Sequence, residues 1–532
     1  MTSIRRGRPP GRLVDPTPPD GATFHSEVRI GWLLRSWRLA VRPESSARTF
    51  AQTLTELGRS ADASRVSRWE TGQLPVPLDV VAAYERALGM VPGALAAIAV
   101  GMRRLPSAPD DVVGLPVHQF SVADLERVLD VVVDGAPTGS DWFELALLVA
   151  SRPEQVTLPM SVWQTLTATL VKQLGLSVSE AYITRIEAAV LLHEHPRAKQ
   201  ALVRSIGEYV IHPESLLVVD PLSLLTDLTD PPAGDLVLRL LEQQPPGPAL
   251  NGAMWAASAK ATRGHFDADQ LRRLERAVAG IVERVGLHAG GIFNRLSDLV
   301  AVLPDDARRR LGATVLAGEA APAPRSEPVT PWDRAEVRRI SGSLAEMGDA
   351  DDDPLLERLL EEAVFHPDTE RRFQAALTVT FSPHRDRLGA TCGSMIDRHL
   401  RGVAVLPPVV AERVMALLTF VGHEQQRPLL NRVIEEGPDQ LRGSALVAVA
   451  HLPPSEPQPE QRPELMPLLT GDDEELVRRA MYCAGMTGDP CLVELERDPG
   501  VAEWVRHSAA WWRREGPALH EHGAGRSDRP GT

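Results

Sequence analysis

The sequence predicts an all-α protein in which a small N-terminal helical bundle precedes a large helical body. Three observations support this fold class. Apolar residues recur every three or four positions, as in WQTLTATLVKQLG from Trp163 and AYITRIEAAVLLHEH from Ala181, which is the spacing of one helix face. The alternation of apolar and polar residues that is typical of strands is nearly absent. Segments rich in small residues recur loosely in the C-terminal third.

Length and charge indicate a basic head joined to an acidic body. The chain has 532 residues, of which 43% are hydrophobic, and this length predicts two to four globular domains. Residues 1–105 contain 15 arginines, no lysine and nine acidic residues, a formal charge of +6 within a total of -14. The remainder therefore carries -20. Because polyanions are bound by local positive charge, this asymmetry favours a head that binds nucleic acid.

The cysteines and the apolar runs favour a cytoplasmic protein without membrane association. Cys392, Cys483 and Cys491 share no paired or metal-binding spacing, so we expect reduced, buried thiols. The longest small-apolar run, Val91–Gly101, is far shorter than the roughly 20 residues that span a bilayer. The basic N-terminus lacks the apolar region of a signal peptide.

Composition divides the chain into five parts. Residues 1–22 are rich in Pro, Gly and Arg and predict a flexible basic arm. The head, residues 23–105, is expected to form helices at 26–40, 47–57, 63–71, 78–88 and 93–104, with Gly58, Gly72 and Gly89 as stops. A helical domain at 117–318 and a HEAT-like domain at 332–515 follow, separated by the Pro-rich stretch Ala317–Pro331, and residues 516–532 are expected to be a disordered tail.

The C-terminal domain resembles HEAT repeats, in which stacked helix pairs share one core. The segments RRFQAALTV, AERVMALLTFVG, LRGSALVAVAHL, LVRRAMYCAGMTGDP and WVRHSAAWW each place small residues where two helices can approach. Their register marks are Ala376, Ala416, Ala445, Ala480 and Ala509. An irregular helical domain without true repeats is the alternative.

The stretch SRVSRWETG, Ser64 to Gly72, predicts a short helix with two different faces. Asp62 is a favourable N-cap, and Gly72 lies beyond the C-terminal end. Helical spacing turns Val66 and Trp69 toward the core. The opposite face carries small polar residues and arginine, namely Ala63, Ser64, Ser67 and Arg68. Such a face fits a DNA major groove, where arginine can bond guanine with two hydrogen bonds.

Four segments in order, IGWLLRSWR, TFAQTL, SRVSRWETG and PLDVVAAYERALG, resemble the XRE/Cro-type helix-turn-helix of phage-repressor-like regulators. The resemblance covers about Arg29 to Met90. It implies that the helix beginning near Ala63 is the recognition helix and that the helix containing Gln52 crosses the DNA backbone. It also implies a structural Arg38–Glu70 pair. The DNA-contacting residues that we expect are Ala63, Ser64, Arg65, Ser67, Arg68, Gln52, Gln73, Arg48, Arg6 and Arg8.

The chain departs from the family pattern in two places. The stretch between Phe50 and Asp62 is longer than the compact pattern, and Gln73-Leu74-Pro75-Val76-Pro77 replaces the basic residues that often follow the recognition helix. The arm can supply the missing charge, since Arg6-Gly7-Arg8-Pro9 resembles the core of an AT-hook, which binds the minor groove of A·T-rich DNA. A basic tail that contacts phosphates, or a tail without a role, are the alternatives.

Other clusters have simpler interpretations than a functional site. His193-Glu194-His195 and His520-Glu521-His522 space their imidazoles too poorly on a helix to bind a metal. Asp349, Asp351, Asp352 and Asp353 do not have the EF-hand spacing and are expected to solvate a loop and start a helix at Pro354. Trp504, Trp511 and Trp512 are expected to close the last repeat. No catalytic motif is present, so we expect neither enzymatic activity nor a cofactor or metal.

These observations predict a sequence-specific transcriptional regulator that binds double-stranded DNA. The head core is expected from Leu34, Trp37, Phe50, Val66, Trp69, Val81 and Leu88, which leaves little apolar surface on the head for association. We therefore expect a homodimer formed through the acidic body, which can also bind a small-molecule effector or the transcription machinery. The alternative is a helical-repeat interaction scaffold tethered to DNA or to protein partners.

Overall fold

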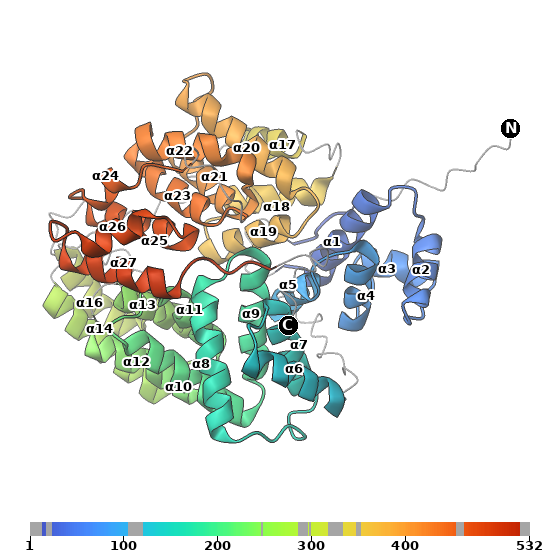
Figure 1. Ribbon diagram of the computed structural model, residues 1–532, viewed down its shortest axis with the longest axis horizontal. Coiled ribbons are helices and arrows are strands. Elements are labelled where there is room, and N and C mark those ends of the chain that lie inside the picture. Colours follow the sequence, from blue (N-terminus) through green and yellow to red (C-terminus); the bar gives the residue numbers. More distant parts are fainter. Residues whose placement is uncertain are drawn as a thin grey trace. The chain divides into compact units, whose positions relative to one another are not determined.

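The computed structural model describes residues 13–17, 24–104, 121–245, 248–285, 296, 299–317, 334–346, 353–453 and 462–521. The all-α fold class is confirmed, because the structure is 74% helical, strands are almost absent from the residues just given, and the helices have a helical-repeat arrangement (Figure 1). The chain divides into two compact units. Unit 1 contains Met1–Val117, Val178–Ile183 and Pro331–Thr532, and unit 2 contains His118–Ser177 and Thr184–Thr330.

The head forms five helices whose bounds match the sequence prediction to within one residue. They are α1 (Ser26–Val41), α2 (Ala47–Glu56), α3 (Ala63–Glu70), α4 (Leu78–Leu88) and α5 (Ala94–Arg104). The caps explain this agreement. Ser46 Oγ accepts a hydrogen bond from Thr49 N at the start of α2, and Gly89, with φ +68°, ends α4 in the left-handed conformation that favours glycine.

Residues 13–17 belong to the folded protein, although the sequence placed them in the flexible arm. Asp15 and Thr17 are both buried. Asp15 Oδ2 accepts from Arg29 Nε at 2.8 Å, and Thr17 Oγ1 accepts from His25 N at 3.0 Å. Burial alone would raise the pKa of Asp15, but Arg29 and Thr17 hold it below its ordinary value. The predicted arm therefore shortens to residues 1–12, which lie outside the described residues.

The C-terminal helices of unit 1 form stacked pairs, as a HEAT-like arrangement requires. Within each pair the helices contact one another, and the second helix of each pair also contacts the second helix of the next. After α17 (Arg334–Glu346), the pairs are α18 (Pro354–Phe365) with α19 (Thr369–Thr380), α20 (Arg385–Leu400) with α21 (Pro408–Val421), α22 (Arg427–Glu436) with α23 (Asp439–Ala450), α24 (Met466–Leu469) with α25 (Glu474–Thr487), and α26 (Cys491–Arg497) with α27 (Glu503–Glu515).

The small-residue register marks fall on the second helix of each pair, in α19, α21, α23, α25 and α27. Four of these five alanines are buried: Ala376, Ala445, Ala480 and Ala509. Ala416 is exposed, so in this repeat the register mark does not lie in the core. In α21 the neighbours Met415 and Leu418 are buried instead, and the helix packs against α20 and α23.

The last pair closes around two tryptophans, as predicted. Trp511 and Trp512 are buried and meet edge to face, with ring centroids 5.0 Å apart. The Trp512 ring lies against Gly485 in α25 so closely that a Cβ there would lie 1.8 Å from the ring. Trp504 is half-buried, and the Arg478 guanidinium lies 5.0 Å from its ring centroid. The aromatic rings therefore serve packing.

A buried group of charges joins the head to the repeats within unit 1. We call it the Glu362 cluster, and its members are Asp15, Arg29, Arg358, Glu362 and Arg371. Glu362 Oε1 accepts from Arg29 Nη2 at 2.8 Å, from Arg358 Nε at 3.1 Å and from Arg371 Nη2 at 3.1 Å. Burial lowers the pKa of Arg371, so this guanidinium depends on the carboxylates around it.

Two tryptophans of α1 also contact the repeats. Trp32 Nε1 donates to Asp353 Oδ2, and Trp37 Nε1 donates to the carbonyl oxygen of Phe381, both at 2.7 Å. Asp353 also caps α18 by accepting from Leu355 N and Leu356 N, as the sequence predicts. The assignment of Trp37 to the head core is wrong, because its half-buried indole bonds to the end of α19 instead.

Unit 2 is a second stack of helices, which the sequence predicted only as helical. Its helices are α6 (Val122–Asp134), α7 (Gly139–Ser151), α8 (Met160–Leu176), α10 (Pro196–Ile211), α11 (Val219–Asp227), α12 (Pro231–Gln243), α13 (Pro248–Thr262), α14 (Ala268–Val285) and α16 (Asp305–Ala317), together with most of α9 (Ser179–Leu192). No helix among the described residues is both long enough and apolar enough to cross a membrane.

Gly485→Ala is expected to lower the free energy of unfolding of the full chain by about 1–3 kcal/mol, because the added methyl group would overlap the Trp512 ring. Gly342→Ala in α17 is the matched control. A Cβ at Gly342 meets nothing within 4 Å, so that change should stabilise its helix by about 0.5–1 kcal/mol. Thermal unfolding of both variants checks the prediction, and equal shifts would contradict it.

Candidate nucleic-acid interface

Helix α3 presents a polar face to solvent and an apolar face to the head core. Asp62 Oδ1 accepts from Arg65 N at 2.8 Å and caps the helix, as predicted. Val66 and Trp69 are buried at 0% and 4% exposure. The opposite side, which we call the α3 face, consists of the half-buried Ala63 and the exposed Ser64, Arg65, Ser67 and Arg68. Residues of α3 therefore lie where helical spacing places them.

Two glycines bring α1 close to the C-terminal end of α3. A Cβ at Gly31 would lie 2.4 Å from the Trp69 carbonyl oxygen, and a Cβ at Gly72 would lie 2.6 Å from Val28 Cα. Gly72 also has φ +67°, a conformation that a larger residue adopts only with strain. The WETG sequence is thus needed for close helix packing, and this packing fixes the orientation of the α3 face.

The Arg38–Glu70 pair is present and buried. Arg38 Nε donates to Glu70 Oε1 at 2.6 Å, and Arg38 Nη2 donates to Glu70 Oε2 at 2.7 Å. Tyr84 in α4 donates its hydroxyl to Glu70 Oε1 at 3.1 Å. Burial and the neighbouring Glu70 carboxylate raise the pKa of Tyr84 well above its ordinary value, so the phenol remains a donor. Helices α1, α3 and α4 are held together at this carboxylate.

Two other buried carboxylates fasten the remaining helices of the head. Glu27 at the start of α1 accepts from Arg103 Nε in α5 at 2.6 Å and from Val76 N at 3.2 Å. Glu85 in α4 accepts from Gly93 N and Ala96 N at the start of α5. Burial raises the pKa of Glu85 to about 7 despite these donors. Both acids therefore serve the internal structure of the head.

The polar residues expected on neighbouring elements are also exposed. Gln52 and Arg48 lie on α2, and Gln73 follows α3. The extra residues between α2 and α3 form the turn 57–62, where Gly58 has φ +81° and Arg59 N donates to the Leu54 carbonyl oxygen. This closure of the helix end keeps the longer turn compact. The departure from the family pattern is thus in the turn, and α2 keeps its predicted place.

Three arginines of this surface are available for a ligand. Arg48, Arg65 and Arg68 are exposed, and none makes an ion pair or side-chain hydrogen bond with another described residue. Exposed guanidinium groups can bond phosphates or the O6 and N7 atoms of guanine. Arg6 and Arg8 lie outside the described residues, so their expected DNA contacts stay predictions.

The histidines of the His193-Glu194-His195 cluster make contacts within the fold. His195 Nδ1 accepts from Ala198 N and caps α10, while its Nε2 lies 2.9 Å from the Val156 carbonyl oxygen. His193 Nε2 lies 2.9 Å from Asp230 Oδ2. Within the part of the chain that is described, no group of three or more His, Cys, Asp or Glu side chains is placed to hold a metal ion. His522, Asp349, Asp351 and Asp352 lie outside that part.

The Glu362 cluster was missed by the sequence analysis, because Arg29 and Glu362 are separated by 333 residues. One signal was available in the head. Helix α1 has the sequence SEVRIGWLLRSWRLAV, which contains more large apolar residues than one buried face of a surface helix needs. Trp32, Leu33 and Leu34 follow one another and are all buried, as expected for a helix that is covered on more than one side.

No model of a protein family matches the chain, and a search of curated proteins gives no significant match.

Glu70→Ala is expected to destabilise the head by about 3–5 kcal/mol, because Arg38 would remain buried without its partner. Hydrogen exchange of α1, α3 and α4 amides in the full chain measures this loss. Glu56→Ala, at an exposed position of α2, is the control and should change stability by less than about 0.5 kcal/mol. Unchanged protection in the Glu70 variant would show that the pair does not stabilise the head.

Proposed function

We propose that the protein is a sequence-specific DNA-binding transcriptional regulator. The observation that supports this best is the α3 face: a capped helix with two exposed arginines and two exposed serines, held rigidly by a buried opposite side. Serine and arginine on such a face suit the donor and acceptor pattern of a major groove. The head thus supplies the sequence reading, and the negatively charged remainder of the chain is kept away from the duplex by repulsion.

In this proposal, the arginines divide into two roles. Arg65 and Arg68 lie on the recognition helix, where side chains meet base edges. Arg48 lies near the N-terminus of α2, where the helix crosses the sugar-phosphate backbone and contacts position the protein without reading sequence. The buried carboxylates Glu27, Glu70 and Glu85 are directed inward, so they do not oppose a phosphate.

We also propose that two copies act together. One recognition helix reads only a few base pairs, so heads of this kind commonly bind symmetric half-sites about one helical turn apart. We propose that the two copies contact each other through their acidic bodies. Selection of binding sites from random duplex DNA with the full chain tests both ideas: enrichment of one two-fold symmetric sequence is expected. If no sequence is enriched, the interaction scaffold becomes the better interpretation.

Arg68→Ala should weaken binding to the selected site by about 1–3 kcal/mol and relax the preference at one base pair, because a base-reading guanidinium is removed. Fluorescence anisotropy with selected and random duplexes measures both effects. Arg309→Ala is the control. Arg309 is an exposed arginine of α16 in unit 2, so its substitution also removes one positive charge, but at a position remote in sequence from the head, and it should leave both affinities unchanged. An equal loss on the two duplexes would reassign Arg68 to phosphate contact.

Deletion of residues 1–12 should reduce the salt dependence of DNA binding while leaving Asp15 and the fold intact. Four arginines, Arg5, Arg6, Arg8 and Arg12, are removed. For each phosphate that the shortened chain no longer neutralises, the log–log salt slope should flatten by about 0.9. Affinities measured across a salt series on A·T-rich and G·C-rich flanks separate an AT-hook from a general phosphate contact. A slope identical to that of the full chain would exclude both roles.

A further inference from the structure

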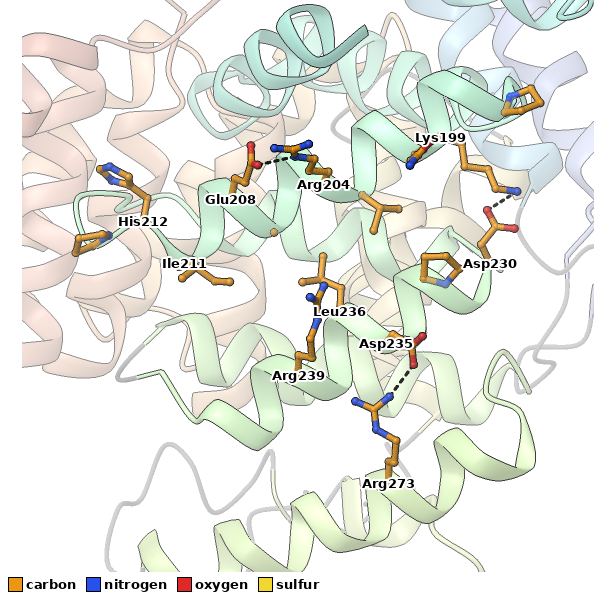
Figure 2. Close-up of a pocket in the computed structure, with 16 residues that line it drawn as sticks. Lys199, Arg204, Glu208, Ile211, His212, Asp230, Asp235, Leu236, Arg239 and Arg273 are labelled. Carbon is orange, nitrogen blue, oxygen red and sulfur yellow. Dashed lines mark hydrogen bonds and ion pairs between the residues drawn. The ribbon is translucent and has the colours of Figure 1, made fainter. Parts of the chain in front are cut away.

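Unit 2 contains a long groove whose function is independent of the DNA-binding head. Its volume is about 1070 Å³, and it lies between α10 and α12, with Arg273 of α14 at its edge (Figure 2). The lining residues of α10 recur along one helix face from Pro196 to Ile211, which corresponds to a length of roughly 22 Å. The groove is therefore elongated and about as large as the sites that enclose drug-sized molecules.

The floor of the groove is apolar because α10 and α12 approach closely at one point. A Cβ at Gly207 would lie 3.2 Å from Leu236 Cδ1, so glycine sets the depth of the groove. Val203 and Leu236 are buried beneath it. Ile211 remains 55% exposed at one end, beside the lining residue Pro213. An apolar ligand lying along α10 would cover this side chain.

The charges of the residues that line the groove do not balance. Each acidic side chain of the lining is paired with a basic one: Asp230 with Lys199, Glu208 with Arg204, and Asp235 with Arg273 (Figure 2). Arg273 also donates to Glu242, which lies outside the lining. Arg239 is left over. It is exposed and makes no hydrogen bond or ion pair with another described residue. Figure 2 shows its side chain beside Leu236, extending from α12 toward α10.

We propose that this groove binds an elongated apolar small molecule that carries one carboxylate. The carboxylate would accept hydrogen bonds from the Arg239 guanidinium, whose planar donors suit that group. The apolar chain would lie along α10 over Val203 and toward Ile211. A single carboxylate neutralises the one unpaired cation. A doubly charged phosphate would leave a negative charge near Glu208 and Asp235, so the carboxylate fits the site better.

Isothermal titration calorimetry of the full chain with decanoate and with its uncharged amide, decanamide, tests the proposal. Decanoate should bind at least tenfold more tightly than the amide. Arg239→Gln should remove this preference and leave the affinity for the amide nearly unchanged. Arg204→Gln is the matched control, because Arg204 is an exposed lining arginine already paired with Glu208. The Arg204 variant should keep most of the preference for decanoate over decanamide.

Ile211→Ser tests the apolar part of the site and should weaken both ligands severalfold. Arg239, Arg204 and Ile211 are all exposed, so these changes leave the packed core intact. Equal binding of the two ligands, an unchanged preference in the Arg239 variant, or no binding of either ligand at millimolar concentration would overturn the proposal. None of these results depends on whether the head binds DNA.

Discussion

A single carboxylate inside the repeats, that of Glu362, receives hydrogen bonds from three guanidinium groups and is almost inaccessible to water. A buried ion of this kind is stable only when its partners are complete, because removal of one partner leaves an uncompensated charge in a medium that solvates it poorly. One of the three partners, Arg29, belongs to the head. The head therefore donates one of the three hydrogen bonds to this buried carboxylate, and both parts lie in one compact unit.

The orientation of the α3 face follows from this constraint through a chain of short contacts. Arg29 fixes α1 on the repeats, together with the indole hydrogen bonds of Trp32 and Trp37. Helix α1 in turn holds α3 through the close approaches at Gly31 and Gly72 and through the Arg38–Glu70 pair. Each link is a buried charge pair, an indole hydrogen bond or a contact without room for a side chain. Rigid elements of this kind position a recognition surface more accurately than loops do.

Local chemistry made much of this structure predictable from the sequence. Asp62 begins a helix through its side-chain cap, Gly72 and Gly89 end helices through their backbone conformation, and the small residues of the repeats mark every second helix. The errors concern residues whose environment depends on distant parts of the chain. Trp37 looked like a core residue of the head, and Asp15 looked like part of the arm. Their partners, Phe381 and Arg29, lie in other elements, and no local pattern specifies such pairings.

The burial of Asp15 fixes the point from which the N-terminal segment extends. Residues 13–17 are held against α1, so Arg8 is attached five residues before Leu13 and Arg6 is attached seven residues before it. A fully extended chain covers at most about 3.6 Å per residue, which limits these two guanidinium-bearing residues to backbone distances of roughly 18 and 25 Å from the anchor. The tether is thus shorter than one turn of B-form DNA, about 34 Å. In the proposed DNA complex, a short tether would keep the local concentration of its charges high, so any duplex that they touch would be the one already bound by the same head.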